Sequence, residues 1–97
     1  MGHLHRIEVQ ISSEQDLREA LTNGASALLL TDVSVEETAR LITMSRELSP
    51  ATIIECSGDI MVENVRGYAE AGADFISVGN LTNAARAMSL SFQIQLA

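Results

Sequence analysis

The sequence of 97 residues is long enough for one folded domain, whereas a closed eight-stranded α/β barrel needs roughly 200 residues or more. Thirteen acidic residues stand against six arginines and no lysine, and the net charge of −7 disfavours binding to nucleic acid or to an anionic membrane. Schiff-base catalysis by a lysine of this chain is therefore excluded. The single cysteine, Cys56, forms no disulfide framework or cysteine metal cluster and fits a reducing cytoplasm.

Four short β-rich segments alternate with helical patterns along the chain. The strands are expected at Ile7–Ile11, Ala27–Thr31, Thr52–Cys56 and Phe75–Gly79. Between them, apolar residues recur at helical spacing in three stripes: Leu17, Leu21 and Ala25; Val35, Ala39, Ile42 and Leu48; and Val62, Val65 and Ala69. Strands that alternate with helices in this way indicate right-handed βαβ units and a parallel sheet. The alternating segment Ser89–Leu96 is expected to add an edge strand to this sheet or to that of a neighbouring copy.

Capping signals mark the ends of the expected helices. Ser34 followed by Glu37 predicts a capping box, and Ser12 followed by Gln15 predicts a second one. The helices are expected to end at Gly24, Pro50 and Gly72. Residues 17–30 also align with residues 65–78, which indicates either a repeated helix–turn–strand unit or convergence of two βα units on one pattern.

These patterns predict an α/β fold in which residues 6–97 form a half-barrel of four parallel βα units, similar to half of a TIM barrel, with a C-terminal strand. An open half-barrel leaves two sheet edges and one sheet face uncovered. We expect either a homodimer that completes the barrel or a rearrangement to a flavodoxin-like sandwich. Met1–His5 are interpreted as a cloning remnant whose histidines bind no metal.

In α/β folds of this kind, ligands bind at the carboxyl ends of the strands. Two glycine turns are expected there, Ser57-Gly58 and Gly79-Asn80, where backbone N–H groups could approach a phosphate; many such turns bind nothing. Polar residues also interrupt the strands, and Glu8 and Gln10 share one strand face. This polar face indicates either a substrate pocket or an edge that faces water. Cys56 is the last residue of its expected strand and is expected to face the candidate site, with a structural role rather than a nucleophilic one.

The chain resembles a known family over Arg6 to Leu96. The segments IEVQISSEQDLREALTNGASALLLTDVS and IIECSGDIMVENVRGYAEAGADFISVGNLT, and the closing A-SLSF, run in the order and spacing of the C-terminal part of quinolinate phosphoribosyltransferase. The resemblance implies conversion of quinolinate and phosphoribosyl pyrophosphate, with Mg²⁺, to nicotinate mononucleotide, carbon dioxide and pyrophosphate in NAD biosynthesis. It also implies oligomers of two or more chains, and an N-terminal part outside this sequence that supplies arginine, histidine and lysine residues.

Transferred position by position, the resemblance implies catalytic roles for Glu8 and, displaced by one position, Asp32. It implies phosphate binding by Ser57, Gly58, Gly79 and Asn80. The chain departs from the family pattern at Gln10, Thr31, Asp59, Met61 and Asn80. Glutamine cannot act as a base, and a carboxylate in a phosphate loop repels the phosphate. We therefore expect the isolated chain to be inactive, to hold no metal or cofactor by itself, and to bind a small molecule only where the pocket persists.

Overall fold

The computed structural model describes residues 7–78 and 93–96, and its centre is one parallel sheet. The strands are β1 (Glu8–Ile11), β2 (Ala27–Thr31), β3 (Ile53–Ser57), β4 (Phe75–Val78) and β5 (Gln93–Leu96). They lie side by side in chain order, and each adjacent pair is parallel. The predicted strands are therefore confirmed to within one residue at most boundaries, and the C-terminal strand joins its own sheet.

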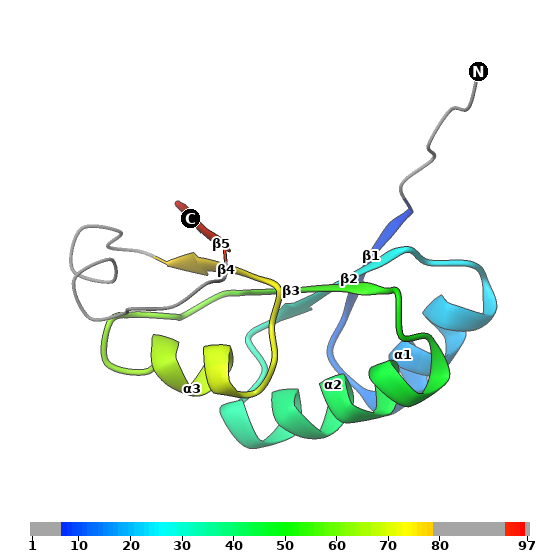
Figure 1. Cartoon of the computed structure of the whole chain (residues 1–97), viewed down its shortest axis with the longest axis horizontal. Coiled ribbons are helices and arrows are strands. Elements are labelled where there is room, and N and C mark those ends of the chain that lie inside the picture. The colour runs from blue at the N-terminus through cyan, green and yellow to red at the C-terminus, as the bar shows by residue number, and fades with distance from the viewer. Residues whose placement is uncertain (1–6, 79–92, 97) are drawn as a thin grey trace.

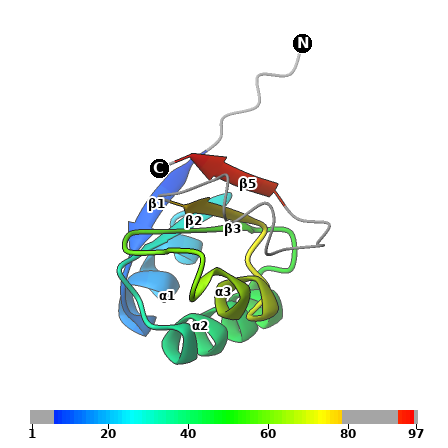
Figure 2. The same ribbon diagram turned by 90° about the vertical axis from the view of Figure 1, so that its left-hand side faces the viewer.

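The described helices all cover the same face of this sheet. They are α1 (Glu14–Thr22), α2 (Val35–Leu48) and α3 (Val65–Glu70), and two perpendicular views show them packed side by side beneath the strands (Figures 1 and 2). This one-sided arrangement confirms the half-barrel-like sheet, because a flavodoxin-like sandwich would place helices on both faces. The segment expected to carry the fourth helix, like Met1–His5, lies outside the described residues. None of the described helices is long and apolar enough to cross a membrane.

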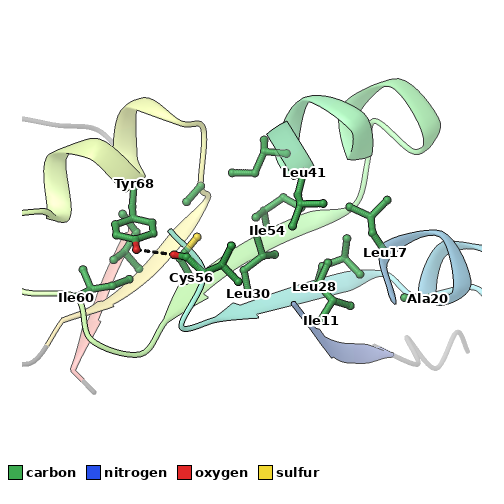
Figure 3. Close-up of a cluster of buried hydrophobic side chains, with 14 of the residues drawn as sticks. Ile11, Leu17, Ala20, Leu28, Leu30, Leu41, Ile54, Cys56, Ile60 and Tyr68 are labelled. Atoms are coloured by element: carbon green, nitrogen blue, oxygen red, sulfur yellow. Dashed lines mark hydrogen bonds between the residues drawn. The ribbon is translucent and has the colours of Figure 1, made fainter. Parts of the chain in front are cut away.

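The hydrophobic core lies between the sheet and the helices (Figure 3). Alternate strand residues point into it, and the fully buried ones include Ile11, Leu28, Leu30, Ile54 and Ile76. Leu17 of α1 and Leu41 of α2 are equally buried and meet them from the helical side. Because the core-facing residues of β1 to β4 follow a strict period of two, the opposite set of strand residues must face away from the helices.

The helix ends agree with the sequence in part. The Ser34 hydroxyl accepts a 3.1 Å hydrogen bond from the backbone N–H of Glu37, as predicted for α2. The predicted cap at Ser12 is wrong by one residue: Ser13 caps α1 and accepts from Asp16 N at 3.2 Å. The Asp16 carboxylate in turn accepts a 3.1 Å hydrogen bond from Ser12 N, so Asp16 takes the reciprocal role in the capping that was predicted for Gln15.

The third helix starts later than its apolar stripe suggests. Residues 61–64 form a turn in which the Asn64 side chain accepts from Met61 N at 2.8 Å and donates to Asp59 O at 3.3 Å. Asn64 then precedes the helix without capping it through its side chain. Gly24 and Gly72 follow α1 and α3 with φ of 86° and 109°, as expected for glycines that end helices.

Candidate functional site

The loops after β2 and β3 meet at the carboxyl edge of the sheet. Thr31 and Ser57 are paired in the register of these strands, and their hydroxyl oxygens lie 3.3 Å apart. One residue further, Asp32 N donates a 3.2 Å hydrogen bond to Ser57 O, which extends the strand pairing into the loop. The two loops that the sequence identified as candidates are thus held together by hydrogen bonds from both side chains and backbone.

Asp32 and Gly58 occupy unusual backbone conformations at this junction. Asp32 has a φ of 58°, a left-handed conformation in which aspartate and asparagine are several times more frequent than other non-glycine residues. Gly58 has a φ of 110°, which strongly favours glycine. A β-carbon on Gly58 would lie 2.7 Å from Asp32 N and 3.1 Å from Asp32 Cγ, and would also collide with Asp32 Oδ1. Glycine is therefore required here by its neighbour as well as by its own backbone.

A shallow hollow of about 250 Å³ opens beside this junction, lined by Asp32, Val33, Ser34, Asp59 and Tyr68. The Tyr68 hydroxyl reaches from α3 and donates a 2.6 Å hydrogen bond to Val33 O (Figure 3). Burial raises the pKa of the Tyr68 phenol, and the nearby negative charges, those of Asp32 and Asp59 among them, raise it further. The phenol therefore stays protonated at neutral pH and anchors the β2–α2 loop as a hydrogen-bond donor.

The sheet face opposite the core is uncovered by the described helices and carries mixed residues. Gln10, Leu29, Glu55 and Phe75 form one row across β1 to β4 in the strand register. Gln10 is exposed and the other three are half-buried. In a complete barrel this face would line the interior, so the polar residues that interrupt the strands do occupy the position that a pocket would need.

The two residues implied to be catalytic do not come together. Glu8 is exposed at the start of β1 and pairs with Ala27, the first residue of β2. Asp32 lies five residues beyond Ala27, and at about 3.3 Å per strand residue the two acids are roughly 16 Å apart along the strand direction. Of the residues implied to bind phosphate, Ser57 and Gly58 lie at the junction, whereas Gly79 and Asn80 lie outside the described residues.

Cys56 does not face the candidate site. Its side chain is buried in the core between the sheet and the helices (Figure 3). Burial, with a smaller contribution from the negative charge of Asp74, raises the pKa of the thiol from 9.0 to about 12. A protonated, inaccessible thiol is a poor nucleophile, which agrees with the structural role expected from the sequence.

The arginines of the described chain do not line the hollow. Arg18 and Arg40 form ion pairs with glutamates on α1 and α2, and Arg46 lies near the amino ends of β3 and β4. Within residues 7–78 and 93–96, there is also no group of three or more histidine, cysteine, aspartate or glutamate residues placed to hold a metal ion. The junction and its hollow therefore present two carboxylates, four hydroxyls and backbone groups, and none of the residues that line the hollow is a cation.

Sequence reasoning identified the two loops but missed Tyr68 and the contact of Asp32 with Gly58. Tyr68 could have been noticed as one of only three aromatic residues in the chain. The contact could not, because it depends on a left-handed aspartate and on two strands being adjacent in space.

Comparison with known proteins agrees with the resemblance. The family described as "Quinolinate phosphoribosyl transferase, C-terminal domain" matches residues 1–93. The chain is 34% identical over 96 residues to the probable nicotinate-nucleotide pyrophosphorylase [carboxylating] of Bacillus subtilis, covering 98% of this chain and 32% of the relative. It is 33% identical over 89 residues to the human nicotinate-nucleotide pyrophosphorylase [carboxylating], covering 92% of this chain and 30% of the relative.

A solved structure shares the fold. The nicotinate-nucleotide pyrophosphorylase from Francisella tularensis superimposes with a TM-score of 0.65 at 28% sequence identity. The superposition covers 73% of this chain and 25% of the other. The present chain thus spans about a third of the length of the relatives it matches.

Proposed function

Because the chain belongs to the quinolinate phosphoribosyltransferase family and matches its C-terminal domain, we propose that it is the C-terminal barrel portion of such an enzyme. The reaction of the whole protein would combine quinolinate with phosphoribosyl pyrophosphate and yield nicotinate mononucleotide, carbon dioxide and pyrophosphate, as a step of NAD biosynthesis in the cytoplasm. Since the chain spans only about a third of its relatives, this activity would require the remaining part of the barrel.

We further propose that the isolated chain does not catalyse this reaction. The observation that carries the proposal is the charge of the candidate site, where Asp32 and Asp59 line the hollow beside Gly58 and none of the lining residues is an arginine. Binding of a diphosphate and stabilisation of the charge that develops on it need cationic groups or a metal ion. Those groups would have to come from the remaining part of the protein.

A role for Mg²⁺ in this reaction is implied only by the resemblance to the family. The described residues offer two carboxylates at the junction and no larger group of potential ligands, so they form no metal cage of their own. A magnesium ion would therefore accompany the diphosphate of the substrate.

The proposal is tested by pairing the chain with the part that it would need. The N-terminal two thirds of the Bacillus subtilis relative is mixed with this chain, and co-elution in size-exclusion chromatography is expected. The C-terminal third of the same relative serves as the matched control, because it must re-form the barrel if such fragments pair at all. If the control third co-elutes with the N-terminal part and this chain does not, the assignment is contradicted. Release of carbon dioxide by the purified chain alone, above a blank without protein, would contradict the inactivity.

A second candidate function is a non-catalytic, self-assembling half-barrel. In the described part of the chain, β1 and β5 are the two ends of the sheet, and one face has no helical cover. Two copies could place β1 of one beside β5 of the other and so close the barrel as a homodimer. We expect Leu29→Arg, on the open face, to weaken this dimer, whereas Leu48→Arg on the helical surface should not. A monomer near 10.4 kDa in sedimentation at micromolar concentration would contradict this candidate.

A further inference from the structure

In the turn after β3, the missing side chain of Gly58 leaves a side of the backbone that an incoming group could approach. That side is already filled. Asp32, from the end of the neighbouring strand, places Cγ 3.1 Å from the position that a β-carbon of Gly58 would take, and its Oδ1 closer still. The absence of a side chain at Gly58 therefore admits a carboxylate of the same chain.

The backbone on both sides of Asp32 is fixed, so this carboxylate is not free to swing away with its loop. Asp32 N donates to Ser57 O at 3.2 Å, and the next residue, Val33, accepts the 2.6 Å hydrogen bond from Tyr68. Ser34, one residue further, caps α2 through its hydroxyl. Three consecutive residues are thus tied to three different elements: β3, α3 and α2.

We propose that Asp32 is a specificity-determining residue that excludes phosphate groups from the glycine turn after β3. Its carboxylate occupies the open side of Gly58, and Asp59 adds a second negative charge to the same hollow. A phosphate that approached this turn would meet both charges and the volume of the Asp32 side chain. Removing Asp59 alone is therefore insufficient to open the turn. The proposal rests on the proposed function only in naming phosphate as the excluded group.

Replacing Asp32 by asparagine distinguishes the effect of its negative charge from the effect of its side-chain volume. Asp32→Asn keeps the size of the side chain and the tolerance of a positive φ, and Asp59→Asn removes the second charge. We expect inorganic phosphate to bind the double variant about tenfold more tightly than the unmodified chain at low ionic strength, since both carboxylates repel a dianion there and salt screens this repulsion. With the volume of the side chain still in place, Asp32→Asn alone should give the larger share of this electrostatic gain and Asp59→Asn alone the smaller share.

The measurement is a titration with inorganic phosphate followed by the amide signal of Gly58 in heteronuclear NMR spectra. Glu47→Gln is the matched control for each single variant, because it changes the net charge by the same one unit from an exposed position on α2. Asp32→Gly, which also accepts a positive φ, replaces Asp32→Asn if the latter does not fold. The proposal is overturned if neither double variant binds more tightly, or if Asp59→Asn alone gives the full gain. Neither result affects the pairing of the chain with the N-terminal part of a relative, so failure here is distinct from failure of the proposed function.

Discussion

Arg46 joins the end of α2 to the amino ends of two strands, and its removal should destabilise the fold more than removal of any exposed ion pair. Its guanidinium donates to Thr52 O at 2.9 Å, to Gly72 O at 3.1 Å and to Asp74 Oδ2 at 3.1 Å. Asp74 Oδ2 also accepts a 2.8 Å hydrogen bond from Ile54 N, the second residue of β3. One arginine therefore holds together α2, the turn after α3, and the starts of β3 and β4.

The magnitude follows from the hydrogen bonds and their exposure. Hydrogen bonds to charged groups contribute about 1.5–3 kcal/mol each in mutational series, but the Arg46 and Asp74 side chains are 35% and 40% exposed, so water replaces part of the loss. We expect Arg46→Ala to lower the free energy of unfolding by about 2 kcal/mol. For a domain of this size that corresponds to a fall in Tm of about 10 °C. The stability of Arg46→Lys should lie between that of Arg46→Ala and that of the unmodified chain, because one ammonium group cannot reproduce the planar set of donors of a guanidinium.

Urea unfolding followed by circular dichroism measures this difference directly. Arg40→Ala is the control: Arg40 forms a shorter ion pair, 2.6 Å to Glu37, and another of 3.0 Å to Glu14, but its side chain lies on the helical surface and is 48% exposed. These contacts lower the pKa of both glutamates through hydrogen bonding to Arg40, yet exposed ion pairs stabilise folds only slightly. An Arg40→Ala variant less stable than Arg46→Ala, or an Arg46→Ala variant indistinguishable from the unmodified chain, would refute the reasoning.

Three further predictions concern buried polar groups. Because the folded state holds the Cys56 proton more tightly, the free energy of unfolding should fall as the pH rises from about 9 to about 12, by up to about 1.4 kcal/mol per pH unit. Urea unfolding at pH 9 and pH 10 should show this fall, and Cys56→Ala should reduce it. Ser45→Ala should raise the free energy of unfolding by about 0.5–1 kcal/mol in the same assay, because the buried Ser45 hydroxyl has no hydrogen-bond partner in the described structure; a loss of stability would contradict this. Tyr68→Phe should cost about 1–2 kcal/mol by leaving Val33 O without its 2.6 Å donor, and an unchanged Tm would show that water replaces the hydroxyl.

Most of the fold could be predicted because its signals are local. The strands follow from short β-rich runs, and α2 follows from a serine cap with a glutamate three residues later, which the structure confirms at Ser34. The errors arose where two local signals compete. At the start of α1 two adjacent serines both fit a capping pattern, and the short side chain of Asp16 decides in favour of Ser13. Before α3 the side chain of Asn64 stabilises a turn that delays the helix.

The sequence could predict where the candidate site lies, but not how its residues contact one another. Parallel strands bring their carboxyl ends to one edge of the sheet, so the loops that contain Asp32 and Gly58 were expected to be neighbours. Their direct contact depends on two positive φ angles, which residue types permit but do not require. The position of Cys56 was harder still, because a residue near the end of a strand faces either the open side or the core, and only the register of the sheet decides between them.

The departures from the family pattern lie where they change chemistry without changing the fold. Gln10 and Asp59 are exposed, Thr31 is half-buried, and Met61 is 41% exposed, so within the described residues none of these positions belongs to the core between sheet and helices. The resemblance implies an acid at position 31, whereas this chain has its acid one residue later, and successive strand residues point to opposite faces. At position 31 a carboxylate would face the uncovered side of the sheet; at position 32 it leaves the strand and packs on Gly58. A shift of one residue therefore keeps the charge near the same edge of the sheet but moves it from the interior of the expected barrel to the mouth of the glycine turn.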